Sequence, residues 1–220
     1  MKFAPKLPAL PAAQRALWPE LKQVPRRFVL YGGTALALRL GHRQSEDFDF
    51  FCDAPMVPDD LLGSLPLLKG ATVRQKALNT LTVVVHRPEP VKLSFFGLEL
   101  RRVGEPDLAD DDIARVATLL DVGGCKMAVI QNRSEAKDYL DIFALLKAGI
   151  GLPEMLGAAQ AIYGAQFYSM ISLKALAWFN EGDLVSLPPD VKETLSRAAG
   201  DVRQIPDFKA LPGGVSPADA

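Results

Sequence analysis

The pattern of apolar and polar positions predicts strands in the first half of the chain. Apolar, β-rich runs occupy residues 28–31, 47–52, 71–85 and 91–96. The third run divides around Asn79 into two strand-like halves, which predicts a hairpin. Short helices are expected between these runs, over residues 10–21, 34–40 and 59–68.

The pattern becomes helical after about Pro106. Segments that begin at Asp112, Val122 and Ser134 show helical periodicity, with Ser134 as an N-cap candidate, and so do residues 154–179 and 190–202. The chain therefore predicts an α+β fold with a mixed sheet followed by a helical half. We expect an α/β core over residues 1–105, a helical region over 106–208 and a disordered tail over 209–220.

Composition is that of a globular protein. The chain has 220 residues, 49% of them hydrophobic, which is enough for a sizeable core. The net charge of −1 excludes a global basic surface for nucleic acid, so RNA contacts would need local clusters such as Arg26-Arg27 or Arg101-Arg102. The two cysteines lack metal-like spacing, and no run approaches the roughly 20 apolar residues that cross a bilayer. A cytoplasmic protein without a membrane partner is expected.

Two glycines mark the first candidate site. Gly32 and Gly33 end the strand at residues 28–31 and precede the helix at 34–40. A glycine turn that opens a helix offers free backbone N–H groups to a phosphate. Since a turn between strand and helix often requires glycine, the pair alone also fits a plain connection.

Two carboxylates follow in the next strand. Strand alternation sends Asp47 and Asp49 to one face, and Phe48 and Phe50 to the core on the other. Neighbouring like charges raise one pKa or recruit a cation, and hard oxygen ligands suit Mg²⁺ or Mn²⁺. The alternative is an exposed strand edge that merely carries an Asp-x-Asp pattern.

These residues together resemble a known family. Gly-Gly-Thr-Ala-Leu at residues 32–36, followed by Arg43, Ser45, Asp47 and Asp49, resembles the nucleotidyltransferase superfamily typified by DNA polymerase beta. Within that superfamily the segment is most similar to the AbiEii/AbiGii toxin family. The resemblance implies a polymerase-beta-like sheet and metal-dependent transfer of an NMP group from an NTP to a hydroxyl. It also implies a toxin with a cognate antitoxin, for which tRNA would be one acceptor.

The resemblance assigns roles to the first cluster. It makes Asp47 and Asp49 catalytic metal ligands and places the triphosphate at the glycine turn. The nucleotide-binding residues that it implies are Gly32, Gly33, Thr34, Arg43, Ser45 and Lys126. For Arg43, a loop arginine paired with Glu46 is an equal alternative.

Residues 121–141 resemble the later motifs of the same family. The matching positions are Lys126, Arg133, Lys137, Asp138 and Asp141. The resemblance makes Lys126 a phosphate contact and Asp138 a catalytic base. Taken alone, the segment fits an amphipathic helix with solvated charges better than a catalytic motif.

The chain departs from the superfamily at a third carboxylate. The strand expected to carry it, residues 91–96, has Lys92 or Ser94 at the corresponding position, and serine is a poor metal ligand and base. Either Asp138 supplies the missing function, or the chain is a degenerate nucleotide-binding or protein-interaction module. An enzyme that modifies a small molecule is a third alternative.

Overall fold

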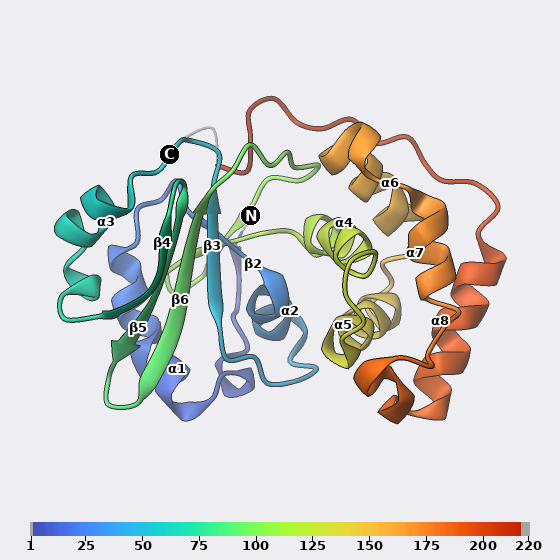
Figure 1. Cartoon of the computed structure of the whole chain (residues 1–220), viewed down its shortest axis with the longest axis horizontal. Helices are drawn as coiled ribbons and strands as arrows, with labels where there is room; N and C mark the ends of the chain where they lie inside the picture. The colour runs from blue at the N-terminus through green and yellow to red at the C-terminus, as the bar shows by residue number, and fades with distance from the viewer. Residues whose placement is uncertain (1, 217–220) are drawn as a thin grey trace. The chain divides into compact units, whose positions relative to one another are not determined.

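The computed structural model describes residues 2–216, which form two compact units. The sheet unit contains residues 2–101, 105–118 and 212–216, and the helical unit contains residues 102–104 and 119–211. Figure 1 shows the strands gathered in the first and the later helices in the second.

The sheet unit is built on one mixed sheet of eight strands. Their order is β1-β7-β8-β2-β3-β6-β5-β4, with β2–β3 antiparallel and β3–β6 parallel. The strands are β1 (Lys2–Phe3), β2 (Val29–Tyr31), β3 (Phe48–Cys52), β4 (Thr72–Ala77), β5 (Thr80–His86), β6 (Pro90–Gly97), β7 (Asp107–Ala109) and β8 (Arg115–Val116). The expected α+β class is confirmed, as is the hairpin at Asn79, whose φ of 56° suits a tight turn.

Strand β3 lies inside the sheet between β2 and β6, and its alternate residues are buried. Phe48 and Phe50 are nearly inaccessible, and the Phe50 ring stacks on Phe95 of β6 at 5.5 Å between centroids. Trp18 packs on Phe48 from the same side. The alternation predicted from the sequence therefore holds, since Asp49 lies between two residues that face the core.

Helices connect the strands as expected. They are η1 (Leu7–Ala9), α1 (Ala12–Leu17), η2 (Trp18–Gln23), α2 (Gly32–Leu40), α3 (Pro58–Ser64) and η3 (Pro66–Leu68). Helix α2 ends at Gly41, whose φ of 67° and N–H bond to the Ala37 carbonyl form a left-handed cap. Lys6 bonds the Leu40 carbonyl at this end, where a cation is favourable.

The helix expected from Asp112 is absent from the described residues, and that expectation is wrong. Residues 107–116 form the two short strands β7 and β8, joined by a turn in which Asp112 has a φ of 59°. Strand β8 pairs with β2, so the sheet unit extends to residue 118 instead of ending at residue 105. Strands of two and three residues are too short to impose a periodicity on the sequence.

The sequence predicts a disordered tail over residues 209–220, but residues 214–216 make specific contacts with the sheet unit. Val215 is fully buried, the Gly214 N–H donates to Asp53 at 3.0 Å, and the Ser216 hydroxyl donates to the Arg27 carbonyl at 2.9 Å. Residues 212–216 therefore return to the sheet unit. Residues 217–220 lie outside the described part of the chain.

The helical unit consists of α4 (Leu119–Val129), α5 (Ala136–Lys147), α6 (Leu152–Tyr163), η4 (Gly164–Gln166), α7 (Ser169–Ala175), η5 (Gly182–Ser186) and α8 (Pro189–Asp201). Helices α4 and α6 pack closely where Gly124 has no side chain: a Cβ there would lie 3.0 Å from the Ala159 nitrogen. Asp121, fully buried, accepts the N–H groups of Val103 and Gly104 at 2.7 and 3.0 Å and ties residues 102–104 to this unit.

The N-cap expected at Ser134 is wrong. Helix α5 has Glu135 at its N-cap position, and the Ser134 hydroxyl donates instead to Glu181. The Ala136 N–H donates to the Asp183 carboxylate at 2.8 Å, so a residue distant in sequence satisfies the helix start. A local sequence pattern could not reveal that partner.

Among residues 2–216, no single helix combines the length and apolar content needed to cross a membrane. In this part of the chain, only the helical segments Ala136–Lys147 and Leu152–Gln166 meet the length and apolar-content criteria when they are taken together, and a bend of 118° separates them.

Candidate functional site

The carboxylate of Asp49 lies against the glycine turn. Gly32 opens α2 with a φ of 73°, a conformation that glycine adopts without strain, and a Cβ there would lie 3.2 Å from Asp49 Oδ2. The antiparallel register that pairs Tyr31 with Asp49 explains this approach, because Gly32 follows Tyr31 directly. The first residue of α2 and a strand carboxylate therefore share one site.

Buried hydroxyl groups hold the chain that leads to Asp47. The Thr34 hydroxyl donates to the Asp47 carbonyl and shares a 2.8 Å hydrogen bond with the Ser45 hydroxyl. Thr34 and Ser45 are only 1% and 8% exposed. These side chains, expected to contact nucleotide, are thus engaged in positioning the backbone of Asp47.

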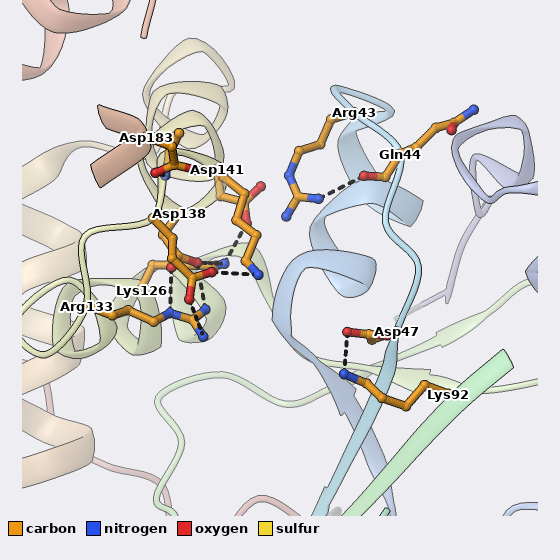
Figure 2. A network of polar contacts seen from close by, with 12 residues as sticks. Arg43, Gln44, Asp47, Lys92, Lys126, Arg133, Asp138, Asp141 and Asp183 are labelled. Atoms are coloured by element: carbon orange, nitrogen blue, oxygen red, sulfur yellow. Dashed lines mark hydrogen bonds and ion pairs between the residues drawn. The ribbon is translucent and has the colours of Figure 1, made fainter. Parts of the chain in front are cut away.

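Arg43 extends over the start of α2. Its guanidinium lies where a Cβ on Gly33 would be, and its Nη1 donates to the Gln44 carbonyl at 2.8 Å (Figure 2). Arg43, Gln44 and Lys6 also line an open hollow of about 510 Å³, completed by Pro8, Ala9, Leu40 and Gly41. Lys6 lies at the opposite end of α2, so Arg43 is the cation that lies against Gly33, and a guanidinium at the glycine turn supports the phosphate-contact interpretation of Arg43.

Lys92 is the partner of Asp47. Its Nζ lies 2.7 Å from Asp47 Oδ2, and both side chains are somewhat less than half exposed (Figure 2). On the same strand Ser94 pairs in register with Asp49 and is nearly buried. Lys92 and Ser94 thus occupy the positions anticipated from the sequence, but the ion pair itself was not anticipated. The parallel register was the missing signal, since it sets Lys92 beside Asp47.

The helical unit contains a separate buried cluster of charges. Lys126 Nζ on α4 lies 2.6 Å from Asp138 Oδ1 and 2.5 Å from Asp141 Oδ2, both on α5 (Figure 2). The two aspartates are fully buried and the lysine side chain is only 7% exposed. Burial with complementary partners excludes the alternative of solvated helix charges for these three residues.

Arg133 completes the cluster around Asp138. Its Nε donates to Asp138 Oδ2 at 2.8 Å and its Nη2 donates to Oδ1 at 3.1 Å. Burial of Asp138 raises its pKa, but the Arg133 hydrogen bonds and the Lys126 charge outweigh burial and hold the pKa below its ordinary value. A stabilised carboxylate whose two oxygens are bonded is a weak proton acceptor, so this environment suits a positioning residue better than the expected base.

The structure therefore brings the sequence candidates together in two groups. Asp47, Asp49, Gly32, Gly33, Thr34, Arg43 and Ser45 gather in the sheet unit, and Lys126, Arg133, Asp138 and Asp141 gather in the helical unit. Lys137 instead pairs with Glu135 at 2.6 Å on the surface. No group of three or more His, Cys, Asp or Glu side chains is placed to hold a metal within residues 2–216.

Arg26 and Arg102, from the two basic clusters considered for RNA contact, are engaged within the fold, and so is Arg39. Arg39 is mostly buried, pairs with Asp107 at 2.9 Å and stacks over the Phe3 ring. Arg26 donates to the Asp112 carbonyl at 2.7 Å, and Arg102 is only 2% exposed. These three residues therefore do not form a basic groove.

Comparison with known proteins gives a family match over most of the chain. Residues 20–211 match the family described as nucleotidyl transferase AbiEii toxin, type IV TA system. An uncharacterised protein of Aquifex aeolicus (strain VF5), aq_aa25, is 31% identical over 157 residues, which cover 70% of this chain and 74% of that protein.

Solved structures share the fold. MenT4, a nucleotidyltransferase toxin from Mycobacterium tuberculosis H37Rv, superposes with a TM-score of 0.55 at 15% identity, covering 87% of this chain and 82% of MenT4. A candidate nucleotidyltransferase from H. pylori gives a TM-score of 0.52 at 18% identity, covering 86% and 90% of the two chains. At these identities the likeness shows a common fold.

Proposed function

The chain belongs to the nucleotidyl transferase AbiEii toxin family, and from that premise we propose a metal-dependent enzyme that transfers an NMP group from an NTP to a hydroxyl acceptor. Family membership makes the protein a nucleotidyltransferase. Metal dependence, the identity of the acceptor and the roles of individual residues are our proposals.

The observation that carries the proposal is the approach of Asp49 to Gly32. A carboxylate and the start of a helix both lie at this point, and a Cβ on Gly32 would fill the space between them. Backbone N–H groups at a helix start favour phosphate, whereas a carboxylate repels it unless a cation lies between. The combination supports a metal–nucleotide complex better than either ligand alone.

The residues fit one Mg²⁺ or Mn²⁺ ion with its nucleotide. Mg²⁺ commonly uses one or two protein carboxylates and takes its other ligands from phosphates and water. Asp47 and Asp49 would provide the carboxylates, with Thr34 and Ser45 fixing the backbone at Asp47. A bound ion would supply neutralisation of the charge that develops on the phosphates.

In the proposed step, the acceptor oxygen forms a bond to the α-phosphorus while the bond from that phosphorus to the bridging oxygen of the β-phosphate breaks. Pyrophosphate leaves, and the hydroxyl proton is released to water. The chain's contribution is positioning. The start of α2 at Gly32 and Gly33 would bind phosphate, and Arg43 would add guanidinium donors.

Lys126 is proposed as a second phosphate contact. An ammonium group has three donors, and Asp138 and Asp141 account for two of them. Asp138 would therefore hold Lys126 in place for phosphate, with Arg133 preserving its negative charge. This role replaces the base expected from the resemblance.

The family's toxin description implies an antitoxin partner, and we propose that a protein partner contacts the helical unit. Tyr168, Met170, Ile171, Trp178 and Val185 expose large apolar surfaces there, which supports such a contact. Co-expression with the product of the adjacent gene, followed by pull-down, tests it. Trp178→Ala with Met170→Ala should weaken capture, while Val57→Ala in the sheet unit should leave capture unchanged.

The activity is tested by incubating the protein with each α-labelled NTP, Mg²⁺ and one acceptor fraction at a time: total tRNA, protein or small metabolites. We expect label to move to one fraction, only with metal, and transfer to fall at least about 100-fold in Asp47→Ala/Asp49→Ala. Asp59→Ala, on the exposed side of α3, is the matched control and should retain full transfer.

The three acceptor fractions separate the remaining alternatives. Label on tRNA supports the RNA acceptor, and label on the small-molecule fraction supports an enzyme that modifies a small molecule. Nucleotide binding without transfer to any fraction would indicate a degenerate binding module. A protein that binds no nucleotide would contradict the proposed site altogether.

A further inference from the structure

Lys92 brings a fixed positive charge to the proposed metal site. Its ammonium nitrogen lies 2.7 Å from Asp47 Oδ2, on the strand where the superfamily resemblance would place a third carboxylate. We propose that this ammonium group takes the place of a second metal ion, so that the site holds a single divalent cation. The inference rests on the metal–nucleotide site proposed above.

The register of β3 and β6 supports the substitution. Phe48 pairs with Leu93 and Asp49 with Ser94, so continuing the parallel register sets Lys92 beside Asp47. Lys92 and Ser94 are two residues apart and share the sheet face of Asp49. A carboxylate at position 94 would therefore lie beside Asp49. The hydroxyl of the Ser94 that is present there lies 3.5 Å from Thr82 Oγ1.

The available charge also favours one ion. A two-metal site clamps the attacking and leaving oxygens between ions that carboxylates hold in place. Among residues 2–216 no group of three or more His, Cys, Asp or Glu side chains is placed to hold a metal, and Asp47 already has a cation at Oδ2. A second divalent ion on Asp47 would have to displace the ammonium group or lie close to a like charge.

The Lys92–Asp47 ion pair contributes little to the stability of the fold, because both side chains are partly exposed. The Lys92 and Asp47 side chains are 45% and 44% exposed, and ion pairs at that exposure add little to stability. An ammonium group is a compact charge with three donors, which can orient Asp47 and offset phosphate charge where a second metal ion would otherwise do so. Lys92 is therefore proposed as a positioning residue.

The test counts bound Mn²⁺ ions by electron paramagnetic resonance. Protein is mixed with an equimolar α,β-methylene NTP analogue, each base in turn, and the loss of free Mn²⁺ signal gives the ions bound per complex. We expect one ion for the wild type, one for Lys92→Arg, and two for Lys92→Gln/Ser94→Asp, which removes the ammonium group and restores a carboxylate. Lys76→Gln removes an exposed ion pair elsewhere in the same unit and should also bind one ion.

Two ions in the wild type would overturn the inference and leave the proposed function intact. A count of one in a folded Lys92→Gln/Ser94→Asp variant, shown to be folded by its circular dichroism and thermal transition, would overturn it as well. If the wild type does not bind the analogue, or binds it equally well with and without Mn²⁺, the proposed site and this inference both fail. The wild-type count therefore decides the question even if the double variant does not fold.

Discussion

The ammonium nitrogen of Lys126 lies 2.6 Å from Asp138 Oδ1, and both side chains are buried, one on α4 and the other on α5. Removing one partner of a buried ion pair leaves an uncompensated charge, which is much more costly than losing a surface pair. The pair therefore joins α4 to α5 and holds the Lys126 ammonium group in place.

Asp138→Asn should destabilise the protein by about 3 kcal/mol, because Lys126 and Arg133 lose the carboxylate that neutralises them. Urea unfolding at neutral pH measures the change. Lys137→Gln is the matched control on the same helix: its pair with Glu135 is exposed, so its loss should cost less than about 1 kcal/mol. Equal effects of the two substitutions would contradict the buried cluster.

The stability contributed by Asp138 should also depend on pH. Its folded pKa is lowered, so the contribution is present above the unfolded value of about 3.9 and is lost as the pH falls through the folded value. The difference in unfolding free energy between wild type and Asp138→Asn should thus stay constant from pH 5 to 7 and shrink below about pH 4. A difference that instead grows as the pH falls from 7 to 5 would mean a raised folded pKa of Asp138 and would restore the role of base.

Thr34→Val should weaken both the fold and the proposed metal site. The substitution keeps the shape of the side chain but removes the hydroxyl that bonds Ser45 and the Asp47 carbonyl, at a cost of about 1–3 kcal/mol. Thr34→Ser keeps the hydroxyl and serves as the control. Thermal unfolding and Mg²⁺–NTP titration calorimetry should rank wild type and Thr34→Ser together, above Thr34→Val; a loss of stability with unchanged nucleotide affinity would limit Thr34 to a structural role.

Gly32→Ala should impair nucleotide binding more than stability. A left-handed φ of 73° costs an alanine about 1–2 kcal/mol, and its Cβ would lie 3.2 Å from Asp49 Oδ2, in the space proposed for metal and phosphate. Gly63→Ala on α3, where a Cβ would meet nothing within 4 Å, is the control and should be neutral or slightly stabilising. Fluorescence titration with a labelled NTP measures the loss; wild-type affinity in Gly32→Ala would exclude phosphate from this turn.

Local patterns predicted the part of the site that is local in sequence. The turn at Gly32 and the alternation around Phe48 and Phe50 depend on neighbouring residues, so the sequence revealed them before the fold was known. The partner of Asp47 depends on register with β6, which no local pattern determines. Lys92 was therefore recognised as an occupant of the strand but not as an ion partner.

The errors have the same origin. Strands β7 and β8 are defined by pairing with β1 and β2, so their few residues carried no strand signal of their own. The start of α5 is satisfied by Asp183 from a distant segment, which made Ser134 a false cap. The environment of Asp138 is equally non-local: a motif gives the identity of the residue, whereas the two cations that lower its pKa become apparent only in three dimensions.

The second glycine pair, Gly123-Gly124, allows two helices to pack closely, whereas Gly32-Gly33 open a helix. In the middle of α4, Gly124 allows α6 to approach so closely that an added Cβ would lie 3.0 Å from the Ala159 nitrogen and 3.1 Å from the Ala158 carbonyl carbon. Backbone cannot rotate away from a methyl group, so Gly124→Ala should lose about 1–3 kcal/mol from overpacking, against a gain of up to about 1 kcal/mol from helix propensity. Gly200→Ala on α8, with open space around it, should show the gain alone. Chemical denaturation of both variants decides the matter, since a stabilised Gly124→Ala would show that the two helices can separate without cost.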